Sequence, residues 1–130
     1  MEPDALKRGA VQVKIDAAGL RHSDLVVING DCPRPMPVVR GHKSAGESVE
    51  CGAGVGDLKP RDRAVTVFMP SCGGGNCVPG MEGRPGLRGP DAASKTTGTL
   101  LSGKCRLSLN GKTVNYHVGV SCVAEHAVIS

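Results

Sequence analysis

Two segments of this chain, AAGLRHSD at residues 17–24 and RGHKSAG at residues 40–46, decide how the rest of it is interpreted. Three of their side chains, those of His22, Ser23 and His42, are of types that bind metals, transfer protons or hold phosphate groups. Two such segments on either side of a short connector have the form of two halves of a zinc site.

Cations stand in both segments at positions where a metal site would need ligands or acids. Arg21 precedes His22, and Lys43 follows His42. A guanidinium group stays protonated and has no lone pair to offer, so Arg21 cannot coordinate zinc. The two segments therefore keep the form of a metal site while lacking most of its ligands.

The composition favours a small β domain with many turns. The 130 residues are enough for one domain with a modest core. They include 19 glycines and 9 prolines but only one Phe, one Tyr and no Trp. The formal net charge of +4 is spread along the chain, and few aromatic side chains are available for base stacking. We therefore expect no nucleic-acid partner.

No part of the sequence has the character of a membrane or export segment. No run is apolar and long enough to span a bilayer, and the N-terminus lacks the apolar stretch of a signal peptide. We therefore expect no membrane partner and a cytoplasmic location. In that compartment the six cysteines should be mostly reduced.

Alternation of apolar and polar residues predicts short strands. Val11, Val13 and Ile15 alternate with polar residues and predict a strand over residues 11–17. Further strands are expected over residues 44–51, 64–68 and 121–129, with a short helix or turn over 24–28 and a hairpin over 105–114 that turns at Asn110-Gly111. In the strand over 44–51, Glu47 and Ser48 stand near the middle, where unpaired burial would cost about 1–3 kcal/mol.

The motifs resemble the N-terminal GroES-like catalytic domain of zinc-dependent medium-chain alcohol dehydrogenases. That family carries Gly-(Leu/Ile/Val)-Cys-His-(Ser/Thr)-Asp, followed by Gly-His-Glu. Further matches occur in family order and extend the resemblance over roughly residues 3 to 130: GVGDLKP (54–60), PSCG (70–73), EGRP (82–85) and AEHAV (124–128). Together they are specific for the family, and most like its class I and class III branches, but not for a substrate.

The resemblance implies a mainly β fold, a GroES-like, partly open β-barrel with short helices and an irregular Gly/Pro-rich lobe. Residues 1–130 would form a single domain, in which residues 72–90 are a degenerate structural-zinc lobe. Family members usually begin with an extra β-hairpin, and this sequence starts close to the segment that follows that hairpin. The strand over 11–17 is therefore expected to present an open edge, which would favour self-association.

The resemblance also implies a catalytic zinc held by a Cys, a His and a second Cys, with a Glu nearby. The first Cys corresponds to Arg21 and the Glu to Lys43, so only the His is kept, as His42. The family's second Cys belongs to a Rossmann domain that would follow residue 130. We therefore expect His42 to be a vestigial ligand, with no catalytic zinc bound by this chain alone.

His22 and Ser23 match the family in identity. In the family the His approaches the cofactor phosphates, and the hydroxyl contacts the zinc-bound alkoxide and begins a proton relay. Both roles depend on a metal and a cofactor. In this chain we expect them to be vestigial catalytic residues, and without those groups Ser23 and Asp24 would act as local caps or turn formers.

A second zinc site is implied in the Gly/Pro-rich lobe, where the family pattern is Cys-x2-Cys-x2-Cys-x7-Cys. This chain has Cys72 and Cys77 with a longer spacing, and Gly80 and Arg88 at the other two ligand positions. Two thiols should lose most of the binding energy of a complete structural site. We expect Cys72 and Cys77 to be vestigial ligands in a lobe without fixed structure.

The family binds NAD(H) or NADP(H) through a Rossmann domain with a glycine fingerprint. The run GAGVG at residues 52–56 lacks that context, because Pro60 follows and no long helical pattern begins. We predict a turn there, no Rossmann cofactor domain in these 130 residues, and neither zinc nor NAD(P) bound tightly by this chain alone. Both chain ends look cut, which suggests a truncated or degenerating product.

The leading functional hypothesis is an alcohol-dehydrogenase-like N-terminal domain that is inactive on its own, so its status as an enzyme is left open. One alternative is half of a split zinc-dependent dehydrogenase that acts with a separate Rossmann chain. A second is a non-catalytic binding or assembly module, because a fold does not fix a function.

Overall fold

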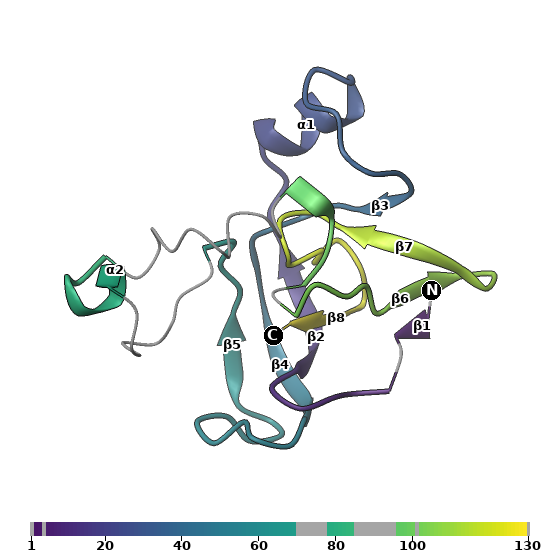
Figure 1. Cartoon of the computed structure of the whole chain (residues 1–130). Helices are drawn as coiled ribbons and strands as arrows, with labels where there is room; N and C mark the ends of the chain where they lie inside the picture. Colours follow the sequence, from purple (N-terminus) through teal and green to yellow (C-terminus); the bar gives the residue numbers. More distant parts are fainter. Residues whose placement is uncertain (1, 4, 70–77, 85–95, 101, 130) are drawn as a thin grey trace.

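The computed structural model of the chain describes residues 2–3, 5–69, 78–84, 96–100 and 102–129. Short strands make up most of this part, and a seven-residue helix follows the second strand (Figure 1). The elements, in chain order, are β1 (Glu2–Pro3), β2 (Val11–Ala18), α1 (His22–Ile28), β3 (Val38–Val39), β4 (Ser44–Cys51), β5 (Arg63–Val65), α2 (Val78–Met81), β6 (Leu107–Leu109), β7 (Lys112–Tyr116) and β8 (His126–Ile129).

The strands form two four-stranded sheets, with strand orders β1-β6-β7-β3 and β5-β4-β2-β8. Neighbouring strands are antiparallel, except that β3 runs parallel to β7. The prediction of a mainly β fold is confirmed. Among the described residues these pairings leave two open sheets and do not close a barrel.

The longest strands, β2 and β4, agree closely with the sequence pattern. The strand predicted over 44–51 is confirmed as β4, and the one predicted over 11–17 is one residue longer as β2. The prediction that this strand would be an open edge is wrong, because β2 pairs with β4 on one side and with β8 on the other. The second neighbour, β8, comes from the far end of the chain. Self-association stays a prediction.

The two polar residues in the middle of β4 both have partners. Ser48 is buried, and its hydroxyl donates a hydrogen bond to the carbonyl oxygen of Lys59. Glu47 is half-buried, and its carboxylate lies 3.9 Å from the guanidinium of Arg63 on β5. The cost expected for unpaired burial is therefore avoided, because the β4–β5 connection returns to cover Ser48.

The predicted hairpin is confirmed as β6 and β7. Its turn residues Asn110 and Gly111 both have positive φ, 52° and 74°, which a two-residue hairpin turn of this kind requires. The last strand is shorter than predicted, since β8 begins only at His126. Val118 and Ser121 have positive φ, which takes the chain out of an extended path before β8.

A small apolar core holds the sheets together. One cluster of buried core residues consists of Ala10, Leu100, Leu107, Val114, Tyr116 and Val128.

No helix within the described ranges is long and apolar enough to cross a membrane.

Candidate functional site

The site begins at α1, which directly follows the end of β2. Arg21 takes the N-cap position in an extended conformation, and Asp24 stands at the third helical position. The Asp24 carboxylate accepts a hydrogen bond from the Arg21 backbone N–H at 2.9 Å. Its other oxygen accepts one from the Gly41 backbone N–H at 3.1 Å. Asp24 is the local cap that the sequence predicted, and it also joins the helix to the segment before β4.

Gly41 brings the second segment close to the end of the chain. Its φ is +92°, and a Cβ there would lie 2.6 Å from the Val123 side chain, so only glycine fits without movement. The backbone N–H groups of Cys122 and Val123 donate to the carbonyls of Gly41 and Arg40. This contact fixes the position of His42, which is 4% exposed.

A second buried imidazole enters from the segment after β7. His117 is 3% exposed, and its backbone N–H donates to the hydroxyl of Ser121 at 2.8 Å. The Ser121 hydroxyl in turn donates to the carbonyl of Val39 at 2.6 Å. The positive φ of Val118 and Ser121 makes this tight loop, and the loop directs His117 toward α1.

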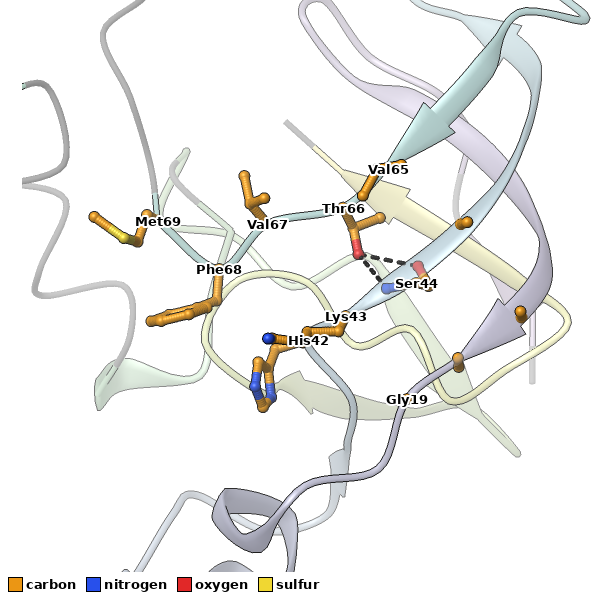
Figure 2. A pocket seen from close by; sticks show the side chains of 12 residues that line it. Gly19, His42, Lys43, Ser44, Val65, Thr66, Val67, Phe68 and Met69 are labelled. Atoms are coloured by element: carbon orange, nitrogen blue, oxygen red, sulfur yellow. Dashed lines mark hydrogen bonds between the residues drawn. The ribbon is translucent and has the colours of Figure 1, made fainter.

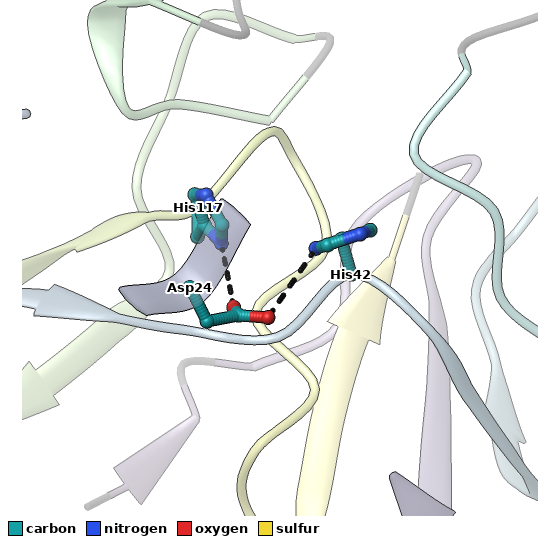
Figure 3. Close-up of side chains that lie close together, drawn as sticks. All are labelled: Asp24, His42 and His117. Carbon is teal, nitrogen blue, oxygen red and sulfur yellow. Dashed lines mark ion pairs between the residues drawn. The ribbon is translucent and has the colours of Figure 1, made fainter. Parts of the chain in front are cut away.

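Asp24, His42 and His117 form one buried group, which we call the Asp24 cluster (Figure 3). The Nδ1 atom of His117 lies 3.4 Å from one carboxylate oxygen of Asp24, and the Nδ1 atom of His42 lies 3.9 Å from the other. The two rings meet edge to face, with centroids 5.6 Å apart. Neither Nδ1 atom has a hydrogen-bond partner within the part of the chain that the structure describes.

The surroundings of the cluster favour a neutral imidazole at His117. Burial is the main cause and lowers the pKa of His117; the carboxylate of Asp24 opposes this effect. The nearby cations Arg34 and Arg40, together with His42, lower the same pKa further. A neutral imidazole is the form that can accept a proton or bind a metal.

A small cavity of about 270 Å³ lies beside the cluster. Its polar lining is rich in groups that carry or can carry positive charge, and both imidazoles of the cluster border it. The polar lining residues are Arg21, Ser23, Cys32, Arg34, His42 and His117.

A larger cavity of about 650 Å³ lies on the other side of His42, between the end of β2, the start of β4 and the segment after β5 (Figure 2). Its lining is mostly apolar. Val65 and Val67 are 77% and 67% exposed, and Phe68 packs against the His42 ring with centroids 5.3 Å apart. Ser44 and Thr66 hydrogen-bond to each other at its edge. His42 and Phe68 therefore border both cavities.

The residues predicted from the sequence fall into three groups. His42 is buried at the centre of the site, and Ser23 is exposed at the rim of the small cavity. His22 is exposed and lines neither of the two cavities. Cys72 and Cys77 lie outside the described residues, so the prediction for the Gly/Pro-rich lobe stays a prediction.

The residues around His42 do not fit the zinc site that the resemblance implies. Arg21 and Lys43 occupy the positions of the Cys and the Glu, and both side chains are exposed. Arg21 borders the small cavity and Lys43 the larger one. Neither the guanidinium nor an ammonium group can ligate a metal, so His42 is the one family-type ligand among the described residues.

The part of the site that His117 supplies does not follow from the sequence motifs. No motif includes His117, and the position of Asp24 predicts only a local role. The two residues come from opposite ends of the chain, so no local pattern joins them. The signal that could have pointed to His117 is weak: the residue lies between two segments predicted as strands, and histidine is intermediate between the typically buried and the typically exposed residue types.

Comparison with known proteins agrees with this fold. The family model for the alcohol dehydrogenase GroES-like domain matches residues 7–129. An S-(hydroxymethyl)glutathione dehydrogenase from Escherichia coli O1:K1 / APEC is 32% identical over 125 residues, which cover 95% of this chain and 33% of that protein.

Solved structures agree as well. A benzyl alcohol dehydrogenase from Acinetobacter calcoaceticus superposes with a TM-score of 0.77 at 25% identity, over 98% of this chain and 33% of that one. An alcohol dehydrogenase zinc-binding domain protein from Burkholderia ambifaria gives a TM-score of 0.82 at 26% identity, over 95% of this chain and 33% of that one.

The chain belongs to the alcohol dehydrogenase GroES-like domain family. Its fold is of the GroES-like β type, as predicted. It spans about a third of the length of the relatives it matches.

Proposed function

We propose that this alcohol-dehydrogenase-like domain does not catalyse zinc-dependent alcohol oxidation on its own. The observation that supports the proposal is the place of Arg21, which borders the small cavity beside His42 where the family pattern has a zinc-binding Cys. A catalytic zinc needs three protein ligands and one open position. With Arg21 there, His42 lacks the thiolate that would complete such a set from this domain.

The same proposal extends to the nicotinamide cofactor. Hydride transfer needs the nicotinamide next to the reacting alcohol, and a Rossmann site is built on a parallel sheet with flanking helices. In the described residues β3 and β7 are the parallel pair, and no helix covers them in a βαβ unit. The run at residues 52–56 belongs to the turn-rich connection between β4 and β5. Tight NAD(P) binding by this chain is therefore not expected.

The direct test is an oxidation assay with the purified chain, Zn²⁺ and NAD⁺. Benzyl alcohol and S-(hydroxymethyl)glutathione, which the names of two relatives specify, serve as substrates. We expect no NADH above background, with the wild type and His42→Ala giving the same rate. A full-length benzyl alcohol dehydrogenase is the positive control. NADH formation that His42→Ala abolishes would overturn the proposal.

The larger cavity favours a second candidate, half of a split dehydrogenase. Its lining includes Val65, Val67 and Met69, which are 77%, 67% and 47% exposed. Contiguous exposed apolar side chains commonly mark a surface that another chain covers. The occupant we propose is a nucleotide-binding chain, since about two thirds of each relative has no counterpart in this chain.

This candidate is tested by co-expression with the remaining two thirds of the Escherichia coli relative as a separate chain. A stable complex on size-exclusion chromatography, lost in Val67→Asp, would support it. The matched control is Val49→Asp, because Val49 is also an exposed valine but lies on β4 and does not line the cavity. Two chains that elute separately at micromolar concentration would rule it out.

A further inference from the structure

Three side chains from three distant parts of the chain place metal-binding atoms together. Asp24 comes from α1, His42 from the segment before β4, and His117 from the loop after β7 (Figure 3). One donor atom from each lies within 4.8 Å of the other two. The three residues are 1%, 4% and 3% exposed, so the group is enclosed by protein.

Two nitrogen atoms of this group lack a hydrogen-bond partner in the described part of the chain. The Nδ1 atoms of His42 and His117 are buried and make no hydrogen bond to any described residue. Both are directed at the carboxylate of Asp24. Buried polar atoms are nearly always satisfied, and a bound cation would satisfy this pair and the buried carboxylate together. Such a cation would attract the lone pairs of both nitrogens and the negative oxygen.

We propose that Asp24, His42 and His117 bind one divalent transition-metal ion, with Zn²⁺ as the natural candidate. Two imidazoles and one carboxylate are a frequent ligand set for such ions. Donor atoms around a tetrahedral zinc stand about 3.3 Å apart at normal bond lengths. The Nδ1 atoms of His117 and His42 lie 3.4 and 3.9 Å from different oxygens of the carboxylate, and one donor atom of each residue lies within 4.8 Å of the other two. The three side chains must therefore move closer together to bind an ion at normal bond lengths.

The remaining lone pairs of Asp24 are sufficient for this role. Each carboxylate oxygen already accepts one backbone hydrogen bond, from Arg21 and from Gly41. A carboxylate has about four acceptor sites, so each oxygen retains one. The two backbone donors hold the carboxylate in place, in the way that outer-shell hydrogen bonds orient the ligands of known metal sites.

This site differs from the one that the family pattern implies. It does not use positions 21 and 43, and it replaces the missing thiolates by Asp24 and His117. The side chains of Arg21 and Lys43 are exposed, so solvent screens their charges. Arg34 and Arg40 act on His117 from nearby and oppose a cation, whereas the Asp24 carboxylate favours it. The small cavity bordered by both imidazoles gives the ion a path of entry.

Metal binding at the Asp24 cluster does not by itself allow alcohol oxidation, because hydride transfer also needs a nicotinamide cofactor next to the reacting alcohol. Three protein donors from separate elements would hold α1, the β4 approach and the β7 loop together, whether or not a reaction occurs. Metal bound without NADH formation agrees with both proposals. NADH formation by a His117→Ala variant would overturn the proposed function alone, and a wild type that binds no metal would overturn the metal site alone.

The test is a titration of the reduced, chelator-treated chain with Co²⁺, followed by its visible absorption, and with Zn²⁺ by calorimetry. We expect one ion per chain on nitrogen and oxygen donors. Binding by Cys72 and Cys77 would instead show intense thiolate-to-cobalt absorption. In His117→Ala the affinity should fall by at least the roughly 10–100-fold that loss of an outer-shell partner costs. His126→Ala, which removes an exposed His, should bind as the wild type does.

A second measurement needs no variant. Nitrogen NMR of the imidazole side chains in the wild type should show Zn²⁺-induced shifts at Nδ1 of His42 and His117, while His22 and His126 stay unchanged. Any of three results would overturn the site: no ion bound at micromolar concentration, equal affinity in His117→Ala, or shifts confined to His22 and His126.

Discussion

The Asp24 side chain links two segments of the site through its hydrogen bonds. It is 1% exposed, and its two oxygens accept hydrogen bonds from the backbone of Arg21 and of Gly41. One bond caps α1 and the other holds the segment that carries His42. A buried carboxylate in this position costs free energy unless its hydrogen bonds are made, so the cap and the segment depend on the same group.

Replacing Asp24 by Asn should therefore destabilise the metal-free domain. The amide keeps one oxygen acceptor but turns an NH₂ group toward a backbone N–H, which leaves a buried donor without a partner. We expect the free energy of unfolding to fall by about 1–3 kcal/mol, measured by urea denaturation in the presence of a chelator.

Asp31→Asn is the matched control, because Asp31 is an exposed carboxylate in the turn after α1. It should change the free energy of unfolding by no more than about 0.5 kcal/mol. Equal stability of the two variants would contradict the role of Asp24 as a shared anchor for the helix and the His42 segment.

At the residue scale the sequence revealed only part of the site. His42 is predicted as a vestigial zinc ligand because its Gly-His motif resembles that of the family, and the structure buries it at the centre of the site. His117 has no such motif, and its position depends on the loop that Val118 and Ser121 form with positive φ. Non-glycine residues rarely adopt positive φ, so the identities of Val118 and Ser121 do not predict this loop.

At the scale of elements, β2 and β4 are the two central strands of the β5-β4-β2-β8 sheet. The end of β2 leads to α1, and β4 begins just after His42. Gly46 lies opposite Ile15 in this pair. A Cβ at Gly46 would overlap the carbonyl oxygen of Lys14 and press on the Val13 side chain. The glycine therefore lets the two strands approach closely at the point where they lead to α1 and to His42.

Gly46→Ala should separate the two strands and weaken the sheet. Overpacking of this kind commonly costs about 1–3 kcal/mol, and we expect a loss in that range by urea denaturation. Gly56→Ala is the matched control, since a Cβ at Gly56 would meet no atom within 4 Å and its φ lies outside the left-handed region. A Gly46→Ala variant as stable as Gly56→Ala would contradict the close approach of β2 and β4 at this position.

Local pattern predicted these elements well and their neighbours poorly. Alternation located β2 to within a residue, and Asn110-Gly111 located the β6–β7 hairpin, because both signals are contained in the segment itself. The strand predicted over 44–51 matches β4. The pairing of β2 with β8 joins opposite ends of the chain. No local signal encodes such a pairing, which is why the open edge was predicted for the wrong strand.

At the scale of the whole molecule, the family fold is kept, while Arg21 and Lys43 stand where the family pattern has a Cys and a Glu. The chain superposes on alcohol dehydrogenases over nearly its whole length and about a third of theirs. The expected cytoplasmic location, self-association and the absence of a nucleic-acid partner stay predictions. If sedimentation velocity showed a homogeneous oligomer, the alternative function as a non-catalytic binding or assembly module would be favoured.

The metal content of the whole chain is best measured by native mass spectrometry of the reduced protein with added zinc, applied to the wild type, His117→Ala and Arg21→Ala. We predict that His117→Ala carries one zinc ion fewer than the wild type, while Arg21→Ala carries the same number. Such a result would place the metal on the Asp24 cluster and not at the family-type position. A zinc count that His117→Ala leaves unchanged would contradict a metal site at the Asp24 cluster.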